Sequence, residues 1–373
     1  MRDNSIKSNT IEWLRFFCVG AVLLLHAVGF PLKGYEVISC HNGIYDTVRI
    51  LFSEGLCRTA VPIFFLFSGY LFFVGLETWR TDSWIKKLQK RARTLLVPFI
   101  LWNLISILYS LMMLYLRYCF KVGEEPDIAV WFHQIGGLRA LWDSGKGEWP
   151  HNYPLWFIRD LMVFVLLAPV IYQLLKKTKL FGLTSLYLVY FLNIWVDLPG
   201  LSAEGLFFFS AGAYFAIHGI DFTSLLRKRQ IIIAATLISC PLVITMVLTY
   251  GNYNNLWGYA CRAFTLSGVA STIGIVALLF KKQRLKVHPL LSSSSFFVYA
   301  AHGTIVFPRI KVILDKVLPY NQFWLIVSYF AMPVLTIALL VLCYYFLSNW
   351  MPKTLSVLTG GRVYRDIRID RQL

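Results

Sequence analysis

The chain has 373 residues, of which 57% are hydrophobic, and 36 Lys and Arg against 19 Asp and Glu give a formal net charge of +17. Soluble domains are closer to ~45–50% apolar, and here the apolar residues form continuous blocks of the length, ~20 residues, that crosses a bilayer. Because the cations lie in short connections between these blocks, we interpret them as a topology signal. An ordinary soluble protein is excluded, and no nucleic-acid partner is expected.

The blocks predict an all-α, polytopic membrane protein, because their continuous pattern favours helices over a closed barrel. We expect one membrane domain over residues 1–373, with about ten transmembrane helices and no cleavable signal peptide. The ten spans are expected near 11–31, 57–77, 94–117, 154–174, 180–197, 203–219, 230–250, 260–280, 293–311 and 323–348.

The connections alternate in charge along the chain. Those after the second, fourth, sixth and eighth spans are rich in Lys and Arg, whereas 118–153 is the long acidic connection. Cytoplasmic loops carry the excess of basic residues, so both termini, 1–10 and 349–373, are predicted to be cytoplasmic. Segment 118–153 is then an ordered outer loop on the membrane face. Cys40 and Cys119 fall on this outer side, and whether they pair is left open.

The first span contains three ionisable residues, which are costly inside a membrane and suggest function. Arg15 and His26 are eleven positions apart, a rotation of ~1,100° that returns to within ~20° of the same helix face. Glu12 lies one turn before Arg15 on that face. His26 would lie ~16 Å deeper than Arg15, a length similar to the extended pantetheine arm of coenzyme A. The alternative is an interfacial Glu12–Arg15 ion pair and a histidine that only packs.

Five segments in this order make the chain resemble the membrane acyltransferase family 3. They are IEWLRFFCVGAVLLLH (Ile11–His26), RTAVPIFFLFSGYLF (Arg58–Phe72), KRARTLLVPFILW (Lys90–Trp102), PLWFIRDL (Pro154–Leu161) and FFVYAAH (Phe296–His302). Many members append an extracytoplasmic hydrolase-like domain. This chain ends soon after the tenth span, so it resembles the stand-alone O-acyltransferase type.

The resemblance implies transfer of an acyl group, acetyl or alternatively succinyl, from cytoplasmic acyl-CoA to a sugar hydroxyl outside. It places Arg91 and Arg93 where the family's phosphate-contacting arginines lie, with Arg15 beside them. We expect His26 to act as the general base, and a covalent acyl-histidine intermediate is the alternative left open. Acetyl-CoA is the expected co-substrate, and no permanently bound cofactor or metal is expected. The expected acceptor is a cell-surface glycan or lipid-linked sugar, and the expected location is the bacterial cytoplasmic membrane.

A further set of polar residues is predicted to support the site or face the substrate. These are Glu12, Ser68, Arg159, Asp160, Tyr299 and His302. Ser68 precedes Gly69, and for this pair packing between helices is favoured slightly over substrate contact. The Arg159–Asp160 pair is either structural or faces the acceptor sugar. His302 is either the partner of a buried group or a second base. Two rival functions use the same membrane fold: a transporter or flippase, and a non-catalytic ligand sensor. Turnover of labelled acyl-CoA would distinguish them from an enzyme.

Overall fold

The computed structural model describes residues 2–29, 31–32, 43–76, 79–120, 125–144, 149–196, 198–250 and 255–364. Within these ranges the structure is helical apart from one isolated bridge between Leu198 and Leu201. The all-α prediction is therefore confirmed. Cys40 lies outside the described residues, so its pairing with Cys119 remains open.

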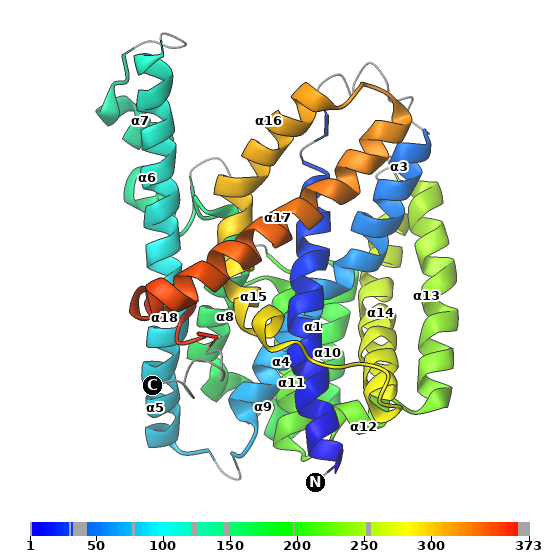
Figure 1. Cartoon of the computed structure of the whole chain (residues 1–373). Coiled ribbons are helices and arrows are strands. Elements are labelled where there is room, and N and C mark those ends of the chain that lie inside the picture. The colour runs from blue at the N-terminus through cyan, green and yellow to red at the C-terminus, as the bar shows by residue number, and fades with distance from the viewer. Residues whose placement is uncertain are drawn as a thin grey trace, which may run out of the picture.

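The helices follow one another with short connections (Figure 1). They are α1 (Arg2–Ala27), α3 (Ile44–Arg49), α4 (Ala60–Phe73), α5 (Thr81–Arg91), α6 (Val97–Cys119), α7 (Ile128–Gln134), α8 (Trp156–Leu166), α9 (Ala168–Thr178), α10 (Leu180–Leu192), α11 (Ala203–Ile217), α12 (Phe222–Leu226), α13 (Arg229–Thr249), α14 (Asn255–Lys281), α15 (Pro289–Ala301), α16 (Phe307–Val317), α17 (Gln322–Trp350) and α18 (Pro352–Thr359). Three π-helical turns, η1 (Ile50–Gly55), η3 (Ala92–Leu96) and η6 (His302–Val306), interrupt the longer helices.

Within the described residues, 7 helical stretches are long and apolar enough to cross a membrane, or 8 if one bent pair counts as a span. The bent pair joins α8 to α9 at 65°. Pro169 at the start of α9 explains the bend, because proline lacks an amide hydrogen and clashes with the preceding turn. α10 and α11 have 13 and 15 residues, which is short of a bilayer core of ~30 Å. All ten predicted segments coincide with helices, but ten complete crossings remain a prediction.

α1 runs through the middle of the molecule and contacts α4, α14, α15 and α17 (Figure 1). α4 and α11 approach closely because both carry a glycine at the contact. A methyl group on Gly69 would overlap the carbonyl oxygen of Phe209, and one on Gly212 would overlap that of Leu66. Small residues allow such close backbone packing between membrane helices. Gly69 is thus explained by packing, and this contact fixes α4 beside α11.

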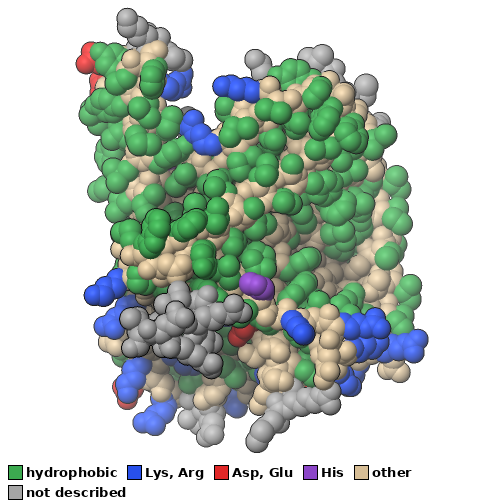
Figure 2. Space-filling view, in the orientation of Figure 1, with side chains coloured by type: hydrophobic (Ala, Val, Ile, Leu, Met, Phe, Trp, Pro, Cys, Tyr) green, Lys and Arg blue, Asp and Glu red, His purple; other side chains and the backbone are tan. Residues whose placement is uncertain are grey.

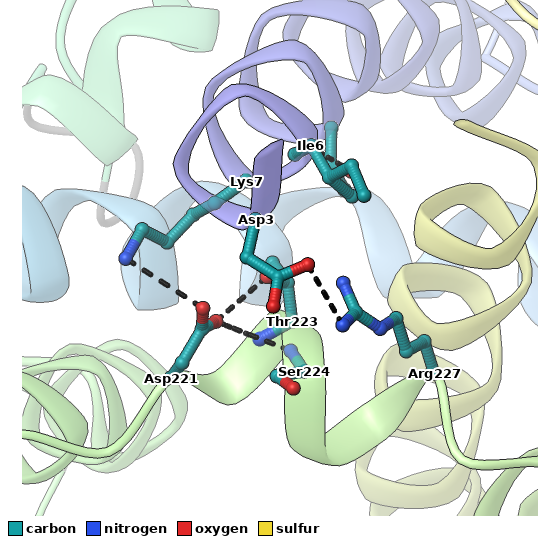
Figure 3. A network of polar contacts seen from close by, with 8 residues as sticks. Asp3, Ile6, Lys7, Asp221, Thr223, Ser224 and Arg227 are labelled. Atoms are coloured by element: carbon teal, nitrogen blue, oxygen red, sulfur yellow. Dashed lines mark hydrogen bonds and ion pairs between the residues drawn. The ribbon is translucent and has the colours of Figure 1, made fainter. Parts of the chain in front are cut away.

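Charged side chains gather at the end of the molecule where α1 begins, and apolar side chains cover most of the rest of the visible face (Figure 2). Figure 3 shows how this end is held together. Asp3 pairs with Arg227 at 3.0 Å and Lys7 with Asp221 at 3.8 Å. Burial raises the pKa of Asp221, but hydrogen bonds from Thr223 and the backbone of α12, together with Lys7, outweigh it and lower the pKa below its usual value. The start of α1 is thereby fixed against α12.

Candidate active site

A cavity of about 100 Å³ lies between α1, α4, α8 and α15. Its walls are mainly apolar, with aromatic and aliphatic side chains from all four helices. Its polar lining residues are Arg15, Ser68, Arg91, Ser295, Tyr299 and Arg362. None of its lining residues carries a carboxylate. A largely apolar cavity with a few placed polar groups is the usual form of a small-molecule site.

Three arginines from distant parts of the chain meet in this cavity. Arg15 is on α1, Arg91 ends α5, and Arg362 follows α18. No hydrogen bond or ion pair joins Arg15 or Arg91 to any part of the chain that the structure describes. Burial, followed by the charges of Arg15 and Arg91, lowers the pKa of Arg362 to about 10. Three like charges with no carboxylate among the residues that line the cavity favour an anionic ligand, and phosphate matches the planar guanidinium fork.

Arg362 was not predicted as a site residue, because by sequence it belongs to a basic tail. The chain turns back after α18 through Gly360 and Gly361, whose φ angles are +63° and +90°. Such left-handed angles suit glycine. The Arg362 carbonyl then accepts hydrogen bonds from the hydroxyls of Tyr344 at 2.9 Å and Thr359 at 2.8 Å. The Gly-Gly pair was the only sequence signal that the tail reverses here.

Two histidines from distant parts of the chain stack on each other. The ring centroids of His26 and His302 are 5.3 Å apart with an interplanar angle of 30°. His302 is fully buried at the start of η6, and its Nδ1 lies 2.7 Å from the carbonyl oxygen of Tyr299. Because a carbonyl only accepts, Nδ1 carries the hydrogen, and in the neutral ring Nε2 is left as an acceptor. π-Helical turns are frequent at functional sites.

The arginines and histidines belong to one continuous arrangement. α1 is unbroken from Arg2 to Ala27, so the predicted shared face and the ~16 Å rise from Arg15 to His26 follow from helix geometry. Tyr299 lines the cavity, and its ring lies 6.2 Å from that of His302. The histidine pair, which is not among the lining residues, therefore adjoins the cavity through Tyr299.

The other predicted residues differ in where they lie. Ser68 lines the cavity. Glu12 is half-buried, and no ion pair with Arg15 is formed in the structure. Arg93 is exposed in η3 and is not among the cavity's lining residues. Within the described ranges, no group of three or more His, Cys, Asp and Glu side chains is arranged to hold a metal.

Arg159 and Asp160 are buried, with 3% and 1% exposure. They pair at 3.1 Å. Arg159 also donates to the carbonyl of Trp142 at 3.0 Å, and Asp160 accepts from the backbone amide of Ser202 at 3.2 Å. These contacts tie α8 to the outer loop and to the α10–α11 connection. The structural interpretation of this pair, which the sequence left open, therefore has direct support.

Two comparisons with known proteins agree with each other. The acyltransferase family 3 profile, described as "Acyltransferase domain", matches residues 8–355. The chain is 29% identical over 366 residues to the succinoglycan biosynthesis protein ExoH of Rhizobium meliloti (strain 1021). This alignment covers 95% of the chain and 92% of that relative. No solved structure matches the chain.

Proposed function

The chain belongs to the acyltransferase family 3, and we propose that it is a bacterial membrane O-acyltransferase that moves an acyl group from cytoplasmic acyl-CoA to a glycan hydroxyl. An acetyl group is the expected cargo and succinyl the alternative. The observation that carries the proposal is the meeting of three arginines in one cavity, whose wall residue Tyr299 adjoins a stacked pair of histidines. The similarity to a succinoglycan biosynthesis protein supports a cell-surface glycan or lipid-linked sugar as the acceptor.

Arg15, Arg91 and Arg362 are the proposed contacts of the coenzyme A phosphates. Charge-assisted hydrogen bonds from guanidinium to phosphate are among the strongest available to a protein. The pantetheine arm would follow the face of α1 from Arg15 towards His26, over the ~16 Å that the helix rise sets. Arg93 remains a sequence-based prediction as a phosphate contact, since the cavity does not include it.

His26 is the proposed general base. Its ring takes the proton of the acceptor hydroxyl as the oxygen attacks the thioester carbonyl. A carbon–oxygen bond forms, the carbon–sulfur bond breaks, and the leaving thiolate recovers the proton from His26 to give free coenzyme A. A positioned base of this kind typically contributes ~10²–10⁴ in rate. His302, stacked on His26, adds a second acceptor nitrogen at the same place.

The test is turnover of labelled acyl-CoA by the purified protein, combined with mass spectrometry of surface glycans from cells with and without it. We expect release of free coenzyme A and an acyl mass that is lost from the glycan when the protein is absent. Binding of acyl-CoA without turnover would instead indicate a ligand sensor. Movement of an unmodified substrate would indicate a transporter or flippase.

A further inference from the structure

Two buried polar atoms beside His26 have no hydrogen-bond partner among the residues that the structure describes. They are Nε2 of His302 and the hydroxyl oxygen of Tyr153. The Tyr153 ring meets the His26 ring edge-on, with centroids 4.8 Å apart. Leaving a buried polar group unpaired is unfavourable, so such groups call for an explanation. Both of these residues place their rings against the ring of the proposed base.

The position of Tyr153 is set by its neighbour Asn152, which is 1% exposed. The backbone amide of Asn152 donates to Asn103 on α6 at 3.0 Å, and its side-chain amide donates to the carbonyl of Ala300 on α15 at 3.0 Å. Its side-chain oxygen accepts from Thr304 in η6 at 3.1 Å. Three separate elements therefore hold the end of the outer loop in the protein interior.

Gly303 lets this loop end approach the histidine pair. A methyl group there would lie 2.6 Å from the Pro154 ring and 3.0 Å from the Tyr153 ring. Contacts this short essentially do not occur between real carbon atoms, so any larger residue would displace the loop. Tyr153 is thus held between His26 and η6 by close packing and by the bonds of Asn152.

The two unpaired atoms differ in hydrogen-bonding character. Nε2 of His302 can only accept, because Nδ1 holds the ring hydrogen against the Tyr299 carbonyl. The Tyr153 hydroxyl can donate. An acyl transfer brings together one group that accepts, the thioester carbonyl, and one that donates, the acceptor hydroxyl. One unpaired atom that donates and one that accepts therefore complement a reactant that accepts and a reactant that donates.

We infer that Tyr153 is a further catalytic residue, whose hydroxyl donates a hydrogen bond to the thioester carbonyl oxygen as that oxygen becomes negative. This inference rests on the proposed function. As the acceptor oxygen attacks, the carbonyl π electrons move onto the oxygen beside Tyr153, and no proton is transferred to it. When the carbon–sulfur bond breaks, the carbonyl reforms. The reacting hydroxyl donates its hydrogen to His26, so Nε2 of His302 accepts a hydrogen bond from a second group of the acceptor, which must therefore carry a further O–H or N–H.

The test is Tyr153→Phe, which keeps the ring and removes the donor. Loss of one oxyanion donor typically lowers kcat by ~10²–10³, so we expect a fall of that size with little change in the KM for acyl-CoA. Transfer to the glycan and slow hydrolysis of acyl-CoA by water should fall by the same factor, because both pass through the same oxyanion. The matched control is Tyr329→Phe, since the Tyr329 hydroxyl is buried near α1 but already bonded to Ser53 at 2.6 Å. The control should keep its rate.

Several outcomes would overturn the inference. A folded Tyr153→Phe protein with wild-type kcat would do so, and so would a loss of transfer with unchanged hydrolysis, which would assign Tyr153 to acceptor binding. If Tyr153→Phe fails to fold, a fluorinated tyrosine at position 153 preserves the shape. Its more acidic phenol should move the alkaline limb of the pH–rate profile to lower pH, and an unmoved limb refutes the role. Absence of turnover in the wild-type protein would refute the proposed function itself.

Discussion

Replacing Arg362 with Gln should stabilise the ligand-free protein against unfolding and weaken its binding of coenzyme A. Burial beside Arg15 and Arg91 lowers the pKa of Arg362 to about 10, a cost of about 3 kcal/mol at ~1.4 kcal/mol per unit. Because the folded pKa lies below the unfolded one, the folded protein loses stability as the pH falls from the unfolded pKa to the folded value of about 10. The full cost is therefore present at neutral pH.

The substitution also removes favourable contacts. The Arg362 side chain donates to the Thr359 carbonyl at 2.7 Å and lies 4.8 Å from the Phe296 ring centroid. Together these contribute about 1–2 kcal/mol. The expected net gain for Arg362→Gln is thus on the order of 1 kcal/mol. A bound phosphate would lose a charge-assisted bond of about 1.5–3 kcal/mol, which raises the Kd for coenzyme A by about 10- to 150-fold.

Thermal unfolding in detergent, with and without coenzyme A, measures both effects. At ligand concentrations of ~100 Kd, binding should stabilise the wild type by about 2.7 kcal/mol. Arg93→Gln is the matched control, because it removes the same charge from an exposed position outside the cavity. If Arg362→Gln lowers the melting temperature of the ligand-free protein and leaves coenzyme A binding intact, the arginine is structural and the reasoning is refuted. An equal loss of binding in Arg93→Gln would restore the sequence-based assignment of that residue.

Three further predictions test other parts of the arrangement. His26→Ala should abolish transfer in a protein that remains folded and inserted, and wild-type turnover in that variant would exclude the general-base mechanism. Cysteines placed at Glu125 and Lys282 should label from opposite sides of intact cells, with position 125 outside; labelling from one side would refute the predicted topology. Burial lowers the pKa of His151 below 6.5, and its Nε2 lies 3.0 Å from the Ser110 hydroxyl. The unfolded chain therefore takes up a proton first as pH falls below 6.5. The loss of melting temperature between about pH 7.5 and 5.5 should be smaller in His151→Gln, and an equal loss in both proteins would contradict this.

Apolar block length and residue spacing predicted most of the helices and the shared helix face of Arg15 and His26. Apolar block length located every helix that was expected to lie in the membrane, because each block must satisfy its own backbone. The shared face of Arg15 and His26 followed from residue spacing alone and holds because α1 is unbroken. Block length could not show where α10 ends, since Ile194, Trp195 and Val196 extend the apolar block beyond the helix.

Contacts between distant residues were beyond these rules. The end of the outer loop, expected on the membrane face, is buried at Asn152 because of hydrogen bonds to residues 49 and 148 positions away. Nothing in the loop's own sequence specifies those partners. Tyr153 consequently looked like an ordinary loop aromatic. The Arg159–Asp160 pair is the opposite case. The sequence singled it out as a candidate site, and in the structure its further contacts are to backbone groups of the protein itself.

The proposed site includes residues from the loop before α8 and from the segment after α18, and the family match does not cover all of it. Tyr153 enters from the loop between α7 and α8, whereas Arg362 enters from the segment after α18. The family match covers residues 8–355, so it includes the histidines, Arg15, Arg91 and Tyr153 but stops before Arg362. The third cation of the cavity therefore lies outside the matched region. Donor affinity should then depend on a segment that a comparison of matched regions would leave out, while the chemistry at His26 should not.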